Sequence, residues 1–316
     1  MLNKKNFYID GKWISPIEPR NYKVIDPSNE EPCAEISLGG KKDVDKAVSA
    51  AKKAFKTWAF SKKEERLDLL EKLYVVYKKR WAEMAKLITL EMGAPMKFST
   101  EMQAATGASH IKSFKNILKD FKFEKDLGDE KNNQKLLYEP KGVCALITPW
   151  NWPINQVNLK VIPALAAGCT VVLKPSEVAP LSSMLLAEMI DQVKFPSGVF
   201  NLVNGDGALT GDALTSHPDI DMISFTGSTR AGALISQNAA KDFKRISLEL
   251  GGKGANIIFK DADAEAVARG VLRCFRNSGQ SCNAPTRMLV EKSIYNEAIE
   301  RLRKYANEFK VDDPNK

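Results

Sequence analysis

Two residues of this sequence could form a reaction centre: Cys282, which ends the segment Gly-Gln-Ser-Cys, and Glu249, which begins Glu-Leu-Gly-Gly-Lys. A cysteine attacks electrophilic carbon as its thiolate, so the surroundings must favour the anion at neutral pH. Gly279 indicates a tight backbone whose amide hydrogens face the sulfur and, later, an oxyanion. The glycines after Glu249 suit close backbone approach, and its carboxylate is able to activate water. From this segment alone, an ion pair between Glu249 and Lys253 is an equally good explanation.

Few residues are available for histidine-based catalysis, because the sequence contains only His110 and His217. His110 lies in a polar, helix-like stretch and His217 precedes a proline, so we expect both to be ordinary surface residues. A Cys-His or Ser-His-Asp mechanism would have to recruit one of them. We therefore expect catalysis without histidine and no metal site.

The other cysteines predict a compartment rather than a reaction. They are widely spaced and bring the total to an odd number, which matches neither a disulfide framework nor a zinc pattern. We expect them to be inert thiols of a cytoplasmic protein. They are Cys33, Cys144, Cys169 and Cys274.

Composition indicates a globular protein of one large or two ordinary cores, with 316 residues, 44% hydrophobic and 27% charged. The net charge of +8 comes from lysines scattered along amphipathic stretches. Without aromatic residues interleaved among them, these lysines do not predict nucleic-acid binding. No apolar run is long enough to span a bilayer, and we expect no membrane association.

Apolar runs of strand type alternate with helical patterns after residue 142, which predicts an α/β fold with a doubly wound, parallel, Rossmann-like sheet. Such sheets bind ligands at the carboxyl ends of their strands. The expected strands are residues 143–147, 170–173, 199–202, 222–225 and 246–248, and the expected helices are residues 154–167, 181–193, 208–216 and 230–240.

The flanking regions follow a different pattern. Residues 7–14 predict a hairpin, helical segments follow it, and the polar stretch 120–139 suits an exposed hairpin or a linker. A second α/β unit begins after Gly252, with expected strands 255–259 and 287–290. Two helices complete that unit, which leaves its small sheet with open edges.

Two segments suit a dinucleotide. Lys174 and Glu177 follow a buried strand and together are able to bind a ribose diol, while the carboxylate would repel a 2′-phosphate. Phe225-Thr226-Gly227-Ser228 leads into a helix whose free amides suit a phosphate. The glycine-rich run 205–211 has one residue too many for the usual dinucleotide fingerprint.

Five segments in the same order resemble the NAD(P)-dependent aldehyde dehydrogenase superfamily across essentially the whole chain. Besides the two that contain Glu249 and Cys282, they are Pro-Trp-Asn-Trp-Pro at 149–153, Lys-Pro-Ser-Glu at 174–177 and Phe-Thr-Gly-Ser-Thr at 225–229. The resemblance implies that Cys282 adds to an aldehyde and that the oxyanion is held by the Asn151 amide and the Cys282 backbone amide. Hydride then passes to the nicotinamide, and water activated by Glu249 hydrolyses the thioester.

The resemblance also implies NAD as cofactor, with Glu177 favouring it over NADP, and a set of residues that bind it. It implies an NAD-binding domain at 1–119 and 141–250, an oligomerisation hairpin at 120–140, and the beginning of a catalytic domain at 251–316. The implied partners are a small aldehyde and further copies of the chain, as a dimer or tetramer. The implied cofactor residues are Thr148, Pro149, Trp150, Lys174, Ser176, Glu177, Gly207, Phe225, Thr226, Gly227, Ser228, Leu250 and Gly251.

Family members continue past the position of Lys316, with a second glutamate motif, most of the catalytic sheet and the substrate funnel. We therefore expect a carboxyl-terminally shortened chain whose aldehyde is not defined by its own residues. An alternative is an NAD-binding fragment or partner subunit without turnover. A third possibility is release of the thioester to coenzyme A, against which Glu249 argues.

Overall fold

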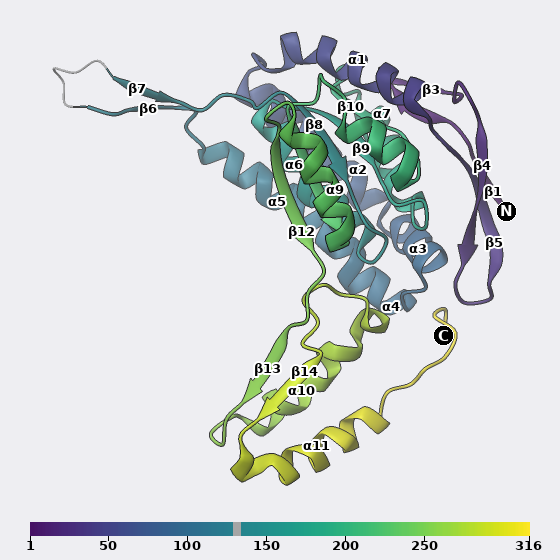
Figure 1. The fold of residues 1–316 in the computed structure, drawn as a ribbon, viewed down its shortest axis with the longest axis vertical. Coiled ribbons are helices and arrows are strands. Elements are labelled where there is room, and N and C mark those ends of the chain that lie inside the picture. Colours follow the sequence, from purple (N-terminus) through teal and green to yellow (C-terminus); the bar gives the residue numbers. More distant parts are fainter. Residues whose placement is uncertain (129–133) are drawn as a thin grey trace.

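The structure, a computed structural model, describes residues 1–128 and 134–316 (Figure 1). Its centre is a seven-stranded sheet in the order β12-β11-β8-β9-β10-β2-β3. The first five are parallel, and the hairpin of β2 (Phe7–Ile9) and β3 (Lys12–Ile14) adds an antiparallel edge. The parallel strands are β8 (Val143–Ile147), β9 (Thr170–Lys174), β10 (Phe200–Leu202), β11 (Met222–Gly227) and β12 (Arg245–Leu250).

The sheet is doubly wound, which confirms the prediction from sequence. From β8 the chain adds β9 and β10 on one side, then crosses to add β11 and β12 on the other. The strand order therefore reverses between β8 and β11. In open α/β sheets the crevice outside the carboxyl ends of the strands at such a point is the usual ligand site.

Helices cover both faces of the sheet, which explains why β8 and β9 are buried along their whole length. Successive side chains alternate between faces, so Leu173 belongs to one buried cluster and Val172 to the other. The first cluster includes residues of α2 (Lys63–Lys79), α3 (Trp81–Met92), α5 (Ala104–Asp120), α6 (Pro153–Ala167) and α7 (Leu181–Val193). The second includes residues of α1 (Lys41–Trp58), α8 (Asp212–Thr215) and α9 (Thr229–Ala240).

Two smaller sheets lie outside this core. β6 (Glu124–Asp126) and β7 (Lys135–Leu137) form an antiparallel hairpin that projects from the molecule, as the polar stretch predicted (Figure 1). The other sheet joins β1 (Leu2–Lys4), β5 (Glu31–Leu38) and β4 (Arg20–Asp26). The sequence analysis did not predict this three-stranded sheet.

Residues 251–316 form a separate body of secondary structure below the large sheet in Figure 1, called the lower lobe here. Its small core contains Ile258, Val267, Val271 and Leu302. The chain then returns to the upper part, where the Pro314 carbonyl accepts a hydrogen bond of 2.7 Å from the Met96 amide. The elements of the lobe are β13 (Ala255–Ile258), α10 (Ala264–Phe275), η3 (Arg276–Gly279), β14 (Arg287–Val290), η4 (Lys292–Ile294) and α11 (Tyr295–Asn307).

Three short elements complete the description: α4 (Met96–Phe98) and the π-helical turns η1 (Ser99–Gln103) and η2 (Gly207–Gly211). Within the described part of the chain, no helix combines the length and apolar character needed to cross a membrane.

Candidate active site

The segments that follow β8, β9, β11 and β12 bring the predicted site residues to one edge of the large sheet. The parallel register pairs Ile147 with Phe225 across the point where the strand order reverses. Thr148 and Thr226, the next residues along the chain, are therefore neighbours there. Pro149, Trp150 and Asn151 continue from β8 away from the sheet.

The Asn151 segment contacts the cysteine segment directly. The Asn151 side-chain amide donates a hydrogen bond of 3.0 Å to the Gln280 carbonyl, two residues before Cys282. Trp150 Nε1 donates to the Gln280 side chain at 3.0 Å, and Trp152 Nε1 donates to the Ser281 hydroxyl at 2.9 Å. These contacts join the large sheet to the lower lobe at the predicted nucleophile.

Cys282 is exposed, and all five cysteines of the chain are free thiols. Its carbonyl lies against Gly252, where an added β-carbon would come within 2.9 Å of the oxygen. Glu249 is also exposed and lies only three residues before Gly252, near the end of the edge strand β12. Glycine at 252 thus permits the strand that carries the predicted base to approach the segment that carries the predicted nucleophile.

A cavity of about 710 Å³ opens beside these residues. Its lining is mixed in character. It includes Phe98 and Trp152, whose rings lie edge to face 5.5 Å apart, and the polar residues Arg276 and Ser281. The space is large enough for a small organic molecule next to the cysteine segment.

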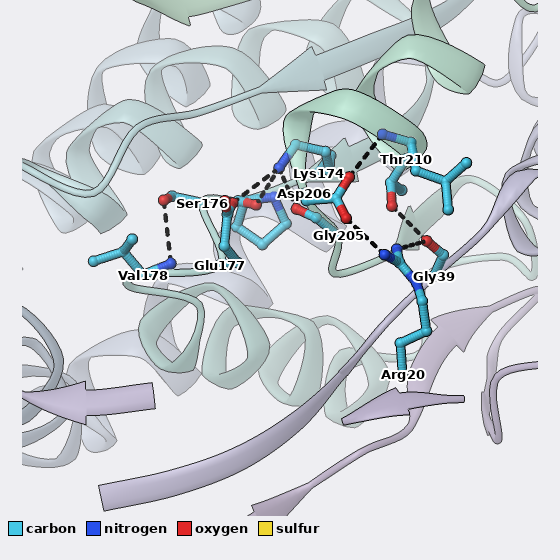
Figure 2. A network of polar contacts seen from close by, with 11 residues as sticks. Arg20, Gly39, Lys174, Ser176, Glu177, Val178, Gly205, Asp206 and Thr210 are labelled. Carbon is cyan, nitrogen blue, oxygen red and sulfur yellow. Dashed lines mark hydrogen bonds and ion pairs between the residues drawn. The ribbon is translucent and has the colours of Figure 1, made fainter. Parts of the chain in front are cut away.

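Lys174, the last residue of β9, is buried among oxygen atoms (Figure 2). Its ammonium donates to the Pro175 carbonyl at 3.0 Å and the Gly205 carbonyl at 2.5 Å, and lies 3.6 Å from the Glu177 carboxylate. Burial lowers the pKa of Lys174, and the negative charge of Glu177 opposes that shift. The structure thus brings the predicted cation and carboxylate together.

Asp206 supports the loop that faces Lys174 in Figure 2. Its carboxylate accepts from Arg20 Nη1 and from the Leu209 amide, each at 2.7 Å. Burial alone would raise the pKa of Asp206, but these hydrogen bonds outweigh it, and the pKa lies below its ordinary value. The sequence reading missed both Arg20 and Asp206, since Arg20 lies on a strand it did not predict.

Gly207 and Gly251 lie next to open space, because a β-carbon added at either position would have no neighbour within 4 Å. At Gly227, in contrast, an added β-carbon would come within 2.4 Å of the Phe225 ring. The Leu250 side chain packs against the second core cluster, and the Ser176 hydroxyl accepts a hydrogen bond of 3.3 Å from the Val178 amide. Among these predicted residues, Gly207 and Gly251 therefore leave space at the edge of the sheet, whereas Leu250 and Ser176 make contacts within the protein.

The edge fits a dinucleotide by its own chemistry. The hydroxyls of Thr148 and Thr226 are buried without a hydrogen-bond partner among the described residues, which leaves them available to a ligand. Ser228 caps α9, accepting 3.2 Å from the Ala231 amide, and the other amides of that first turn suit an anion. Lys174 and Glu177 add a cation and a carboxylate on the neighbouring strand.

Lys160 is a further candidate that the sequence reading missed. It is buried in α6, donates a hydrogen bond of 2.9 Å to the Ser224 hydroxyl, and has its pKa lowered by burial to about 8. The negative charge of Glu249 acts in the opposite direction on the pKa of Lys160. A lysine within an apolar helical run was the available signal.

Known proteins resemble this chain in sequence and in fold. The sequence profile of the aldehyde dehydrogenase family matches residues 13–316. The chain therefore belongs to the aldehyde dehydrogenase family.

Individual relatives match along almost the whole chain. A 3-succinoylsemialdehyde-pyridine dehydrogenase of a Pseudomonas species is 50% identical over 316 residues, which cover 99% of this chain and 65% of that protein. The crystal structure of an aldehyde dehydrogenase from Bartonella henselae superposes with a TM-score of 0.98 at 58% identity, covering 100% of this chain and 66% of the other. A mutant of aldehyde dehydrogenase C from Pseudomonas syringae, in complex with NAD+ and octanal, has a TM-score of 0.95 at 46% identity, with 98% and 63% covered. The chain thus spans about two thirds of the length of these relatives.

Proposed function

We propose that this chain takes part in the NAD-dependent oxidation of an aldehyde to a carboxylic acid, with Cys282 as the nucleophile. The observation that carries the proposal is the hydrogen bond of 3.0 Å from the Asn151 amide to the Gln280 carbonyl. It holds an oxyanion donor beside the segment that ends in the exposed thiol.

In the proposed reaction, the Cys282 sulfur bonds to the aldehyde carbon and the carbonyl oxygen becomes an alkoxide. One hydrogen of the Asn151 amide is bound to Gln280, and the other is available for that alkoxide, together with the Cys282 backbone amide. When bound, NAD supplies the hydride acceptor. Glu249 removes a proton from the water that hydrolyses the resulting thioester.

For the cofactor, we propose that Lys174 and Glu177 bind the adenosine ribose and that the start of α9, with Ser228, binds the pyrophosphate. The closeness of the Lys174 ammonium and the Glu177 carboxylate supports this assignment. A carboxylate at this position disfavours a 2′-phosphate, so the proposed cofactor is NAD rather than NADP. Two solved relatives are in complex with NAD+, which supports NAD as a cofactor.

Steady-state turnover tests the proposal. We expect aldehyde-dependent growth of NADH absorbance, lost in Cys282→Ala and retained in Cys274→Ala, which removes a half-buried thiol of the same lobe. Turnover that survives Cys282→Ala would show that another residue is the nucleophile. Product analysis with and without coenzyme A separates hydrolysis from transfer to a thiol.

A second candidate function is NAD binding without turnover, in a complex with another chain. Its support is the exposed apolar side chains of Ile257, Phe259 and Leu289 on the small sheet of the lower lobe, a surface that suits a protein partner. Calorimetric titration with NAD and the turnover assay together distinguish the two candidates. Both predict heat of NAD binding, but this second candidate predicts no NADH formation.

We also propose that the β6–β7 hairpin joins copies of the chain into a homo-oligomer. The hairpin projects from the molecule and exposes Leu127 and Leu137 (Figure 1). We expect Leu137→Ser to reduce the oligomer mass measured by light scattering. The control, Val75→Ser, removes an exposed apolar side chain of α2 and should leave that mass unchanged.

A further inference from the structure

Two buried amides, Gln103 and Asn277, lie behind the proposed oxyanion donor. Gln103 ends the π-helical turn η1 and is 0% exposed, while Asn277 begins the turn that leads to Cys282 and is 3% exposed. They are 174 positions apart in sequence, yet Gln103 Nε2 donates to Asn277 Oδ1 at 2.8 Å. Neither residue belongs to the site predicted from sequence.

The pair connects to both functional segments through two backbone carbonyls. The Asn151 carbonyl accepts from Asn277 Nδ2 at 2.8 Å and from Gln103 Nε2 at 3.2 Å. The Gln280 carbonyl accepts from Asn277 Nδ2 at 3.1 Å as well as from the Asn151 side chain at 3.0 Å. The three amides therefore form a closed network across the boundary between the upper part of the molecule and the lower lobe.

The backbone of the cysteine segment needs such support. Asn277, Ser278 and Gly279 have φ angles of 55°, 56° and 72°, three consecutive residues in the left-handed region. Residues with a β-carbon disfavour this conformation, although asparagine tolerates it better than most. The conformation persists because the Asn277 side chain is held by the carbonyls on either side of it.

We propose that Gln103 and Asn277 are positioning residues, which fix the Asn151 amide and the turn before Cys282 in the geometry that stabilises the oxyanion. The proposal rests on the function proposed above. By holding the Gln280 carbonyl at its place, the pair fixes one hydrogen of the Asn151 amide and thereby aims the other.

The first test measures backbone hydrogen exchange, which needs no turnover. Gln103→Met keeps a side chain of similar size but removes the donations to the Asn151 carbonyl and to Asn277, and Asn277→Gly permits the left-handed φ but removes the amide. We expect amide exchange of residues 278–283 to become about tenfold faster in both variants. Asn201→Ala is the matched control, since Asn201 is a buried amide that also bridges two carbonyls, those of Val171 and Gly198.

The second test is a double-mutant cycle with Asn151→Ala. If Gln103 acts by orienting Asn151, Gln103→Met should lower kcat about 10- to 100-fold in the parent chain and less than about twofold in the Asn151→Ala background. The KM for NAD should stay unchanged. Circular dichroism checks that each variant folds. If Gln103→Met does not fold, Gln103→Leu takes its place.

Unchanged exchange of residues 278–283 would overturn the proposal, and so would equal losses of kcat with and without the Asn151 side chain. If the parent chain shows no aldehyde oxidation, the proposed function fails but the exchange measurement still decides whether Gln103 and Asn277 hold the turn.

Discussion

The two parts of the molecule that form the site differ in how firmly their strands are buried. In the large sheet, every residue of β8 and β9 is buried between two helical layers. In the lower lobe, β14 alternates between exposed and half-buried positions, and β13 has one buried residue, Ile258, which belongs to a small core. The proposed cofactor residues thus extend from a rigid sheet, whereas the proposed nucleophile depends on side-chain hydrogen bonds that cross to the sheet. Packing should therefore determine the stability of the large sheet. Specific polar contacts should determine the geometry of the nucleophile segment in the lower lobe.

The largest expected effect concerns Glu249, the proposed base on β12 beside the nucleophile segment. We predict that Glu249→Gln lowers the rate of thioester hydrolysis by about 10² to 10⁴. The first equivalent of NADH should still form, since Glu249 is needed only after hydride transfer. Stopped-flow absorbance would show a burst followed by slow turnover. Glu308→Gln, which neutralises an exposed carboxylate of the lower lobe, should behave like the parent, and loss of the burst as well would assign Glu249 to an earlier step.

A matched pair of leucines tests the difference in packing. Leu173 in β9 is 0% exposed and Leu289 in β14 is 55% exposed. We predict that Leu173→Ala lowers the free energy of unfolding by about 2 to 5 kcal/mol. Leu289→Ala should change it by less than about 0.5 kcal/mol. Urea titrations provide the values, and comparable losses at the two positions would contradict the proposed contrast.

Glu91, which joins α3 to α7, should make the stability of the helical layer next to the large sheet depend on pH. It is buried at the end of α3, and its carboxylate accepts from the Leu181 amide and, at 3.1 Å, from the Ser182 amide at the start of α7. Burial raises the pKa of Glu91 from 4.5 to about 7. The folded state therefore binds more protons than the unfolded state between these values, and stability falls as pH rises through that window.

We predict that this window contributes a fall of about 3 kcal/mol in the free energy of unfolding, and that the contribution is absent in Glu91→Gln. Urea unfolding of parent and variant at several pH values between 4.5 and 7.5 isolates it as a difference. Parallel pH profiles of the two proteins would refute the assignment.

The smallest expected effect concerns cofactor choice. Glu177→Gln removes the carboxylate next to Lys174, so we predict that the preference for NAD over NADP narrows about tenfold, or about 1.4 kcal/mol. Calorimetric titration with each dinucleotide gives the ratio. Glu64→Gln, on the exposed first turn of α2, is the control, and an unaltered ratio in Glu177→Gln would remove Glu177 from the ribose site.

The sequence was sufficient for the regular part of the fold because strands buried on both faces read as short apolar runs between helical patterns. The succession of strands and helices from β8 to β12, and the placement of Lys174 and Ser228 at or just after strand ends, followed from that pattern. The β4–β5 pair was missed because polar and charged residues interrupt its apolar ones, so its apolar signal is weak.

The residues that support the site could not be read in the same way. Gln103, Lys160 and Asn277 lie in helices or in a turn and acquire partners only when distant segments meet. Gln103 contacts Asn277 across 174 positions, and Lys160 contacts Ser224 across 64. Local periodicity contains no information on such contacts, whereas a buried lysine or amide becomes conspicuous once burial is known.

In the proposed reaction, covalent chemistry takes place on Cys282, which is held against the Asn151 segment. The most direct test of this chemistry is mass spectrometry of the Glu249→Gln variant after mixing with NAD and an aldehyde. We predict an acyl group on the peptide that contains Cys282, in a one-to-one ratio with the NADH formed. NADH formation with an unmodified Cys282 peptide, or an acyl group on another cysteine, would contradict the account.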